Sequence, residues 1–435
     1  MEASPSPTLE TETVPAPEER GRLFNRNYLM LWIGQTISQL GNQAYGLAVS
    51  FWLMEKTGSA SLMGLLMTVS TLPGVLLAPF GGTFADRHSR IRIIISCDLI
   101  AGFAILGLTA ATFLAPAQVH LLVVLLFVVA VMVGVIRSFF MPAVAATIPD
   151  LVSKENLAPA NSFNQFSVQA SVFVGQATGG ILYRLIGAPM LFLFDGLSFL
   201  FSAATALFIR VDEPHRVRPA TARTGREAFR EFLRETGEGF RFVWANRGMR
   251  DFVLSVSVVN FLLMPVTVLL PFYVRLYLHR DAAWFGFLMA SISVGAVAGF
   301  LLAGALRLRG HARARGILAA LIILPAVFGS FGFLIVPAVA LLGAFLCGAA
   351  VGFINVQFAT MTQLSTPAEL RGRVLGLLNT MAGGLIPIGM ALGGFAGDLT
   401  NKNVPLVAAV CGVLAILVVL STTARRHSRE YLAHG

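Results

Sequence analysis

Charged side chains are scarce in this sequence. Asp, Glu, Lys and Arg together make up 12% of its 435 residues, whereas soluble globular domains carry about 25%. Hydrophobic residues make up 56%, so the chain cannot be an ordinary soluble protein. Cysteine is scarce as well. Cys97, Cys347 and Cys411 are odd in number and fall in or beside apolar stretches, which argues against a disulfide framework.

The sequence also lacks the short motifs of several enzyme and cofactor classes. It has no Walker-type phosphate loop, no HExxH helix, no cysteine and histidine spacing of a metal site and no GxSxG elbow. These absences predict that the protein is not an enzyme and holds no cofactor or metal. Without a nucleotide site, any transport would draw on an ion gradient or on the gradient of the substrate itself.

Long apolar stretches are what the sequence does contain. Most run for about twenty residues or more, enough for a helix to cross a hydrocarbon layer of about 30 Å. We count about twelve such spans. They begin around Tyr28, Ser59, Ile93, Val119, Ala158, Pro189, Asp251, Ala282, Gly316, Val336, Arg373 and Val404. The predicted fold class is therefore an all-α membrane protein with twelve transmembrane helices.

One long polar interruption, residues 212–247, divides the spans into two sets of six. The sequence thus predicts two pseudo-symmetric six-helix bundles, at residues 21–211 and 248–424. Residues 1–20 are rich in Pro, Ser, Thr and Glu and lack the basic start and apolar core of a signal peptide. We expect a disordered cytoplasmic tail there, and a second cytoplasmic tail at residues 425–435.

The basic residues mark one side of the membrane. Of the 32 Lys and Arg residues, 26 lie in the N-terminal segment, in the even-numbered connections or at the C-terminus. By the positive-inside rule these parts are cytoplasmic, so both termini are. This distribution also explains the net charge of +10 without a nucleic-acid partner. The exceptions are Arg137, inside the fourth span, and Lys56, Arg184, Arg275, Arg280 and Lys402 on the opposite side.

Within the interruption, apolar residues recur at helical spacing. They are Phe229, Phe232, Leu233, Phe240, Val243 and Trp244, and charged residues fill the other side. The pattern predicts an amphipathic helix. This helix either lies on the inner membrane surface or is a solvated linker that joins the halves.

The two halves repeat a small-residue pattern. The fifth span contains Gly175-Gln176-Ala177-Thr178-Gly179-Gly180, and the eleventh contains Gly389-Met390-Ala391-Leu392-Gly393-Gly394. Small residues four apart let helices approach closely in lipid, so packing is the simpler interpretation. A doubled six-span architecture is also what a transporter that rocks about a central site requires.

Several stretches carry a resemblance to a known family. They are residues 25–28, 35–41, 82–92, 148–151, 160–161, 194–199 and 371–374. Through them the chain resembles the major facilitator superfamily, and within it the branch of macrolide efflux proteins and the enterobactin exporter. The resemblance implies a bacterial inner-membrane transporter whose spans one, four, seven and ten line a central cavity.

The charged turn after the second span resembles the signature of this superfamily. Gly82 and Asp86 are four residues apart and share one helix face. The resemblance implies a latch in which this face contacts the start of the eleventh span and closes the cytoplasmic side. Its predicted residues are Gly82, Asp86, Arg87, Arg90, Arg92, Gly372 and Arg373. Alternatively, the arginines after Asp86 only orient the chain. Ser89 stands where the family usually has glycine.

The antiporter signature of the superfamily is incomplete. It places proline after the first glycine of GxxxGG in the fifth span, where this sequence has Gln176. The equivalent position of the eleventh span is Met390.

Polar residues inside the spans are candidates for transport chemistry, since they are costly in lipid. Arg137 is expected to face the cavity, where it binds substrate or pairs with a carboxylate, or else to form a structural ion pair. Asp98 and Asp195 are candidates for proton coupling, with structural hydrogen bonding as the alternative. The other predicted cavity residues are Gln35, Gln39, Asn42, Asn260, Asn355 and Gln357.

Together these features predict an exporter of amphiphilic small molecules, driven by proton antiport through alternating access. Its expected partners are the substrate, protons and membrane lipids, and we expect it to act as a monomer in the bacterial inner membrane. Two alternatives remain at this point. One is a transporter of a lipid-like or siderophore substrate without proton coupling. The other is a receptor or assembly factor that keeps the fold and transports nothing.

Overall fold

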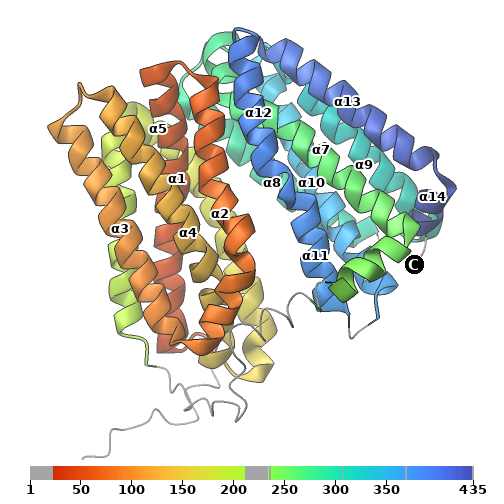
Figure 1. The fold of residues 1–435 in the computed structure, drawn as a ribbon, viewed down its shortest axis with the longest axis horizontal. Helices are drawn as coiled ribbons and strands as arrows, with labels where there is room; N and C mark the ends of the chain where they lie inside the picture. The colour runs from red at the N-terminus through yellow and green to blue at the C-terminus, as the bar shows by residue number, and fades with distance from the viewer. Residues whose placement is uncertain (1–22, 211–233, 235–236, 307, 368–369, 434–435) are drawn as a thin grey trace, which may run out of the picture.

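The computed structural model describes residues 23–210, 234, 237–306, 308–367 and 370–433. Among these residues the chain is helical and contains no strand. The tail predicted at residues 1–20 and most of the predicted linker lie outside the described residues. The all-α class is confirmed, and Figure 1 shows two bundles that touch at one end and diverge toward the other.

The two bundles follow each other along the chain. The first contains α1 (Arg26–Thr57), α2 (Ala60–Arg87), α3 (Arg90–Leu114), α4 (Val119–Leu151), the short η2 (Lys154–Asn156) and α5 (Leu157–Leu207). The second contains α7 (Arg247–Phe272), η3 (Tyr273–Tyr277), α8 (Ala282–Leu306), α9 (Gly310–Ser330), η4 (Phe331–Phe333), α10 (Pro337–Ser365), α11 (Arg371–Gly384), α12 (Ile386–Leu399), α13 (Val404–Ala424) and α14 (Arg426–Ala433).

Helix α5 contains two spans that fold back on each other. Its 51 residues are interrupted at Gly187, whose φ of 75° is accessible to glycine but costly for other residues. Both ends of α5 lie beside the first turn of α1. The hydroxyl of Tyr28 donates to the carbonyl of Ala160 at 2.9 Å, and the Asn27 amide donates to the carbonyl of Arg210 at 2.6 Å. The chain therefore reverses at Gly187.

The span count agrees with the sequence-based prediction. Ten helical segments of the described chain are long and apolar enough to cross a membrane, and α5 counts as one of them. Helix α1 is not among the ten because glutamine and asparagine interrupt its apolar residues, although it is 32 residues long. With α5 counted as two spans and α11 with α12 as one, the structure is consistent with twelve.

Side-chain caps fix where several helices begin. Asn25, Ser59, Asn246 and Asn403 each accept a hydrogen bond from the third residue that follows. Such a cap satisfies one of the backbone N–H groups that a first turn leaves free. Ser89 does the same for α3, since its hydroxyl accepts from the N–H of Arg92. The departure from the family's glycine at this position therefore gives α3 a defined start.

The repeated glycines pack helices together, as the simpler interpretation predicted. In the fifth span Gly175 and Gly179 lie against α1, and in the eleventh Gly389 and Gly393 lie against α7 in the same way. The last glycine of each set contacts the other bundle. Gly180 lies against Ala282 and Ala283 of α8, and Gly394 lies against Ala60 and Ser61 of α2.

These two glycine contacts lie at the end where the bundles touch (Figure 1). We call this the closed end, and it contains the α1–α2 connection at residues 57–60. The opposite end, with the α2–α3 connection at residues 87–90, we call the open end. There, a Cβ built on Gly82 or Gly372 would have no described atom within 4 Å apart from the adjacent residues and backbone of its own helix.

Part of the predicted amphipathic helix is described, and it is helical at residues 237–245. Val243 is buried, whereas Phe240 and Trp244 are exposed and stack on each other with ring centroids 4.8 Å apart. Phe229, Phe232 and Leu233 lie outside the described residues. Whether this helix meets the membrane surface stays a prediction.

Candidate functional site

Arg137 and Asn355 occupy equivalent positions in the two bundles. They lie equally far from the first residues of α4 and α10, Val119 and Pro337, and both are exposed. Each follows an exposed apolar residue, Val128 or Leu346, by nine positions, which is about two and a half turns of helix. Each polar side chain therefore leaves its helix on the face opposite that apolar residue.

Arg137 forms no salt bridge within the described part of the chain, so the pairing with a carboxylate that the sequence allowed is absent from it. On the same face of α4, Leu126 is packed inside the first bundle, whereas Arg137 and Met141, nearer the open end, are exposed. This face of α4 thus changes from buried to exposed along its length. Since Arg137 donates no side-chain hydrogen bond to a described residue, its five N–H donors are open to another molecule.

Gln35 and Asp98 are joined by a hydroxyl that contacts both. The Gln35 amide donates to the hydroxyl of Ser202 at 3.2 Å, and that hydroxyl donates to Asp98 Oδ2 at 2.7 Å. All three residues are buried, and they connect α1, the sixth span and α3. The second oxygen of Asp98, Oδ1, has no hydrogen-bond partner among the described residues. Two predicted site residues thus belong to one network inside the first bundle.

Asp195 is fully buried in the sixth span. Neither of its carboxylate oxygens accepts a hydrogen bond within the described residues, and the nearby Ser198 hydroxyl donates instead to the backbone carbonyl of Asp195 at 2.8 Å. The carboxylate faces Gly41 of α1. Asp195 also forms no salt bridge with a described residue. It is therefore a buried acid with unused acceptor capacity.

Gln39 and Asn260 lie equally far from the starts of α1 and α7, but they differ in their contacts. The Asn260 amide donates to the carbonyl of Ala382 at 3.0 Å, and Ser257 donates to the carbonyl of Met381 at 2.6 Å. These carbonyls lie at the break between α11 and α12, where regular helix bonding ends. Asn260 therefore braces the break. Gln39 Oε1 is buried without a partner among the described residues.

The remaining predicted cavity residues show no shared cluster. Asn42 is half-buried in α1, and Gln357 is buried in α10. At the residue after Asn42, the side chain of Gln176 donates to Gln43 at 3.0 Å and links the fifth span to α1. The residue that replaces the antiporter proline thus contributes a link within the first bundle.

The predicted latch residues at the open end are apart in this structure. Gly82 and Gly372 have no close neighbour at their Cβ positions, and Arg373 pairs with Glu238 at 2.7 Å instead. Arg90 pairs with Asp150 of α4 inside its own bundle. The other two arginines, Arg87 and Arg92, are exposed, and the side chain of Asp86 lies outside the described part.

The sequence profile of the Major Facilitator Superfamily matches residues 31–390. The chain belongs to the major facilitator superfamily. Its two bundles also resemble a solved superfamily structure, a bacterial homologue of the iron transporter ferroportin in an inward-facing state. The TM-score is 0.70 at 17% sequence identity, over 92% of this chain and 100% of that one. This likeness concerns the fold.

Relatives within the superfamily include named exporters. Macrolide efflux protein A of Streptococcus pyogenes is 25% identical over 400 residues, which cover 88% of this chain and 93% of the relative. The enterobactin exporter of Escherichia coli is 27% identical over 409 residues, which cover 92% of each chain. The chain is thus a multi-pass membrane protein of a transporter family, and the branch expected from the sequence motifs is confirmed.

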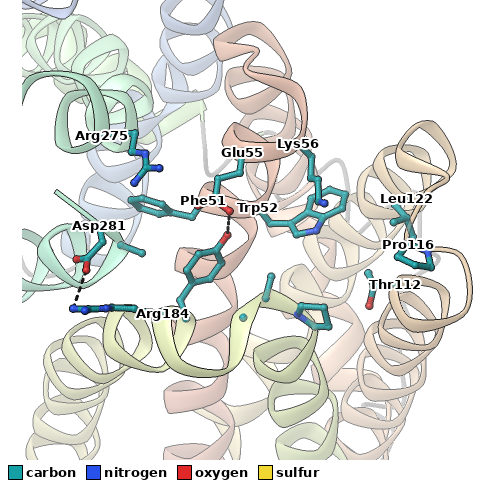
Figure 2. A pocket seen from close by; sticks show the side chains of 15 residues that line it. Phe51, Trp52, Glu55, Lys56, Thr112, Pro116, Leu122, Arg184, Arg275 and Asp281 are labelled. Atoms are coloured by element: carbon teal, nitrogen blue, oxygen red, sulfur yellow. Dashed lines mark hydrogen bonds and ion pairs between the residues drawn. The ribbon is translucent and has the colours of Figure 1, made fainter. Parts of the chain in front are cut away.

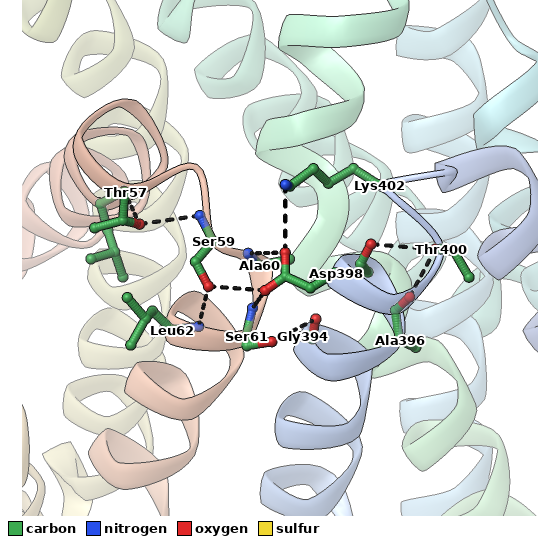
Figure 3. A network of polar contacts seen from close by, with 12 residues as sticks. Thr57, Ser59, Ala60, Ser61, Leu62, Gly394, Ala396, Asp398, Thr400 and Lys402 are labelled. Carbon is green, nitrogen blue, oxygen red and sulfur yellow. Dashed lines mark hydrogen bonds and ion pairs between the residues drawn. The ribbon is translucent and has the colours of Figure 1, made fainter.

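Sequence reasoning missed a carboxylate that joins the two bundles. Asp398, at the end of α12, contacts the first turn of α2 at the closed end (Figure 3). A signal for it exists in the sequence. Gly393-Gly394-Phe395-Ala396-Gly397-Asp398 repeats the spacing of Gly81-Gly82-Thr83-Phe84-Ala85-Asp86, the turn that was identified at the end of the second span.

A pocket of about 430 Å³ lies beside this contact, also at the closed end. Figure 2 shows its charged and aromatic walls, which come from both bundles. The hydroxyl of Tyr183 donates to Glu55 at 2.7 Å, and Arg184 pairs with Asp281 of the second bundle at 3.2 Å. None of the predicted cavity residues lines this pocket. The pocket therefore lies between the two bundles where they touch, away from the predicted substrate cavity.

Proposed function

We propose that this protein exports amphiphilic small molecules across the bacterial inner membrane by proton antiport with alternating access, acting as a monomer. The observation that carries the proposal is the pair Arg137 and Asn355, which are exposed at equivalent positions of α4 and α10. Two polar side chains on facing bundles, away from their lipid-side neighbours, suit a substrate held between the bundles.

The positive-inside rule gives the proposal its direction. The arginines Arg87, Arg90 and Arg92 lie at the open end, so in this orientation the open end faces the cytoplasm. The conformation is then inward-facing, as in the ferroportin homologue. An exporter in this conformation is ready to take its substrate from the cytoplasm or from the inner leaflet.

The substrate class is supported by the relatives and by the mixture of side chains. Two curated relatives are named for the export of a macrolide and of enterobactin. Arg137, Asn355 and the exposed Met141, one turn after Arg137 in α4, offer charge, hydrogen bonds and an adaptable apolar surface. A cavity of that kind accepts several amphiphiles.

Asp195 is the proton carrier in this proposal. It is fully buried in the sixth span, it has no salt bridge and its oxygens accept no hydrogen bond from described residues. A carboxyl group placed in this way is free to gain and lose a proton as the bundles move. Asp98 is held by Ser202, so we assign it the supporting role in the Gln35 network.

The test is reconstitution of the purified protein in vesicles with an imposed pH gradient. A panel of macrolides, dyes, siderophores and lysolipids is added, and accumulation of each is followed with and without the gradient. We expect gradient-dependent flux of at least one amphiphile, and a large loss of that flux in Arg137→Gln. If no member of the panel moves in response to the gradient, the proposal of a proton-driven exporter is wrong. Flux without any pH dependence would favour the uncoupled alternative.

A further inference from the structure

Asp398 makes a multidentate contact across the two bundles. Its Oδ1 accepts from the N–H of Ala60 at 3.0 Å, and its Oδ2 accepts from the N–H of Ser61 at 2.9 Å and from the hydroxyl of Ser59 at 2.9 Å (Figure 3). We call these contacts the closed-end clasp. Lys402, one turn later, holds its ammonium group 3.7 Å from Oδ1.

The clasp uses the start of α2 as its partner. The first N–H groups of a helix have no acceptor within the helix, and they carry the positive end of its dipole. Ala60 and Ser61 are the first two residues of α2, so Asp398 satisfies two of those groups with a negative charge. Hydrogen bonds with a charged acceptor are about twice as strong as neutral ones. The contact therefore favours the closed state of this end.

Glycines bring the two backbones close enough for the clasp. A Cβ on Gly394, one turn before Asp398, would overlap the carbonyl of Ala60, and a Cβ on Gly64 of α2 would overlap the carbonyl of Met390. Gly394 and Asp398 are four residues apart and share one helix face. One short segment of α12 therefore supplies both the glycine that lets the two backbones approach and the carboxylate that binds the start of α2.

The clasp mirrors the latch predicted at the open end. In both, a glycine and an aspartate four residues apart lie at the C-terminal end of a span, Gly82 with Asp86 in α2 and Gly394 with Asp398 in α12. The predicted partner of the first is the start of α11, and the observed partner of the second is the start of α2. Spans two and eleven would therefore bind each other reciprocally, through opposite ends.

We infer that Asp398 is a gating residue whose clasp must break each time the closed end opens. The clasp and the Asp86 latch then stabilise opposite conformations, and the balance between them sets how the protein divides its time between the two. The role of Asp398 stands on the contacts alone, and that of Asp86 rests on the latch predicted from the sequence. Its consequence for export rests on the proposed function.

A second polar contact between the bundles, at the equivalent position of the fifth span, supplies a matched comparison. Arg184 follows Gly180 by four residues, as Asp398 follows Gly394, and it pairs with Asp281 just before α8 at 3.2 Å. This contact across the bundles is one ion pair whose arginine side chain is 70% exposed, whereas Asp398 accepts three hydrogen bonds from the other bundle. Exposed ion pairs contribute little to stability. Of the two equivalent positions, only the Asp398 contact should therefore control the closed end.

The test measures distances by electron paramagnetic resonance on the purified full chain in lipid nanodiscs. The native cysteines are buried, so spin labels can be placed on introduced cysteines. One pair, at Ala117 and Val336, spans the closed end, and a second, at Lys154 and Leu364, spans the open end. These four positions are exposed. The variants are Asp398→Asn, Asp86→Asn and the control Asp281→Asn.

We expect Asp398→Asn to raise the population with a separated closed end by about tenfold, the effect of losing one charge-assisted hydrogen bond. Asp86→Asn should lower that population, and Asp281→Asn should change it by less than about fivefold. Opposite signs for the two aspartates distinguish gating from general damage to the fold. Gly394→Ala, which pushes the backbones apart, should act like Asp398→Asn if the latter variant folds poorly.

The inference is wrong if Asp398→Asn leaves both distance distributions unchanged, or if it shifts them in the same direction as Asp86→Asn. These readouts require no substrate. A failure of the vesicle experiment with every amphiphile would therefore refute the proposed function and leave the distance result standing. In an active vesicle assay, Asp398→Asn should alter the maximal export rate more than the substrate concentration at half-maximal rate.

Discussion

The carboxylate of Asp195 lies directly against Gly41 of α1. A Cβ at position 41 would stand 2.9 Å from Asp195 Oδ1 and 2.5 Å from the hydroxyl of Ser198. Both distances are shorter than normal contacts, so only glycine leaves room for the carboxylate here. The glycine thereby leaves room, between the first and sixth spans, for an acid that pairs with no described residue.

Gly41→Ala should therefore destabilise the protein. The added methyl group must displace Asp195 or the helix that carries it, and overpacking of this kind costs about 1–3 kcal/mol. Thermal unfolding of the purified protein in detergent would measure the loss. Gly46→Ala in the same helix is the control, since no atom lies within 4 Å of its Cβ position. Equal melting temperatures for the two variants would contradict the packing described here.

Asp195→Asn should uncouple export from the pH gradient. Asparagine has nearly the same size as aspartate but cannot release a proton, so substrate binding should persist while gradient-driven accumulation falls to the level of a vesicle without a gradient. Flux and equilibrium binding of one transported amphiphile are measured in parallel. Unchanged gradient-driven flux in Asp195→Asn would exclude Asp195 as the proton carrier.

Ser202→Ala should lower stability more than it lowers coupling. The Ser202 hydroxyl contacts both Gln35 and Asp98, and its removal leaves one oxygen of Asp98 without its donor. A buried polar group that loses its partner costs about 1–3 kcal/mol. Thermal unfolding and gradient-driven flux, compared with Asp195→Asn, separate the two effects. If Ser202→Ala instead abolishes gradient-driven flux and leaves the melting temperature unchanged, Asp98 rather than Asp195 carries the proton.

Arg137→Gln should weaken binding of an anionic or strongly polar amphiphile by about tenfold, because a charge-assisted hydrogen bond is exchanged for a neutral one. Asn355→Ala, at the equivalent place in the second bundle, should act on the same substrates with a smaller effect. Binding can be followed by fluorescence with the purified variants. Arg184→Gln is the control, since this arginine lies at the closed end. A similar loss in the control would indicate a general effect of charge.

Asn260→Ala should loosen the break between α11 and α12. The amide of Asn260 is a partner of the Ala382 carbonyl, and loss of this hydrogen bond should cost about 1 kcal/mol. We expect a lower melting temperature and increased proteolysis near residues 381–386. Substrate affinity should change little, because the side chain is engaged with the backbone. If Asn260→Ala lowers substrate affinity and leaves the melting temperature unchanged, Asn260 contacts the substrate in the cavity.

Much of the fold was predictable from the sequence because the bilayer restricts the choices. Apolar length gave the spans, and the polar stretch at 212–247 divided them into two bundles. The repeated glycines at 175–180 and 389–394 were recognisable as packing surfaces from their spacing alone. The turn at Gly187 was not predicted. Hydropathy locates the fifth and sixth spans, but it does not show that the chain reverses its direction at one glycine between them.

The site was less predictable because a polar residue in a span has several uses. Asn260 and Arg137 look alike as isolated polar residues, yet one braces a helix break and the other is exposed. Only contacts between distant segments distinguish them. Asp398 was missed for a related reason. Its partners lie more than 330 positions away in the chain. The similarity of its segment to that of Asp86 indicates a contact between the bundles only when the structure shows α2 beside α12.

The reversal at Gly187 leaves no connecting loop between the fifth and sixth spans. The fifth span carries Gly180, which lies against α8 at the closed end, and the sixth carries Asp195. Two segments joined through one residue cannot slide far past each other. Gly180 and Asp195 lie seven residues before and eight residues after Gly187. We therefore expect Asp195 to move together with Gly180 when Gly180 separates from α8.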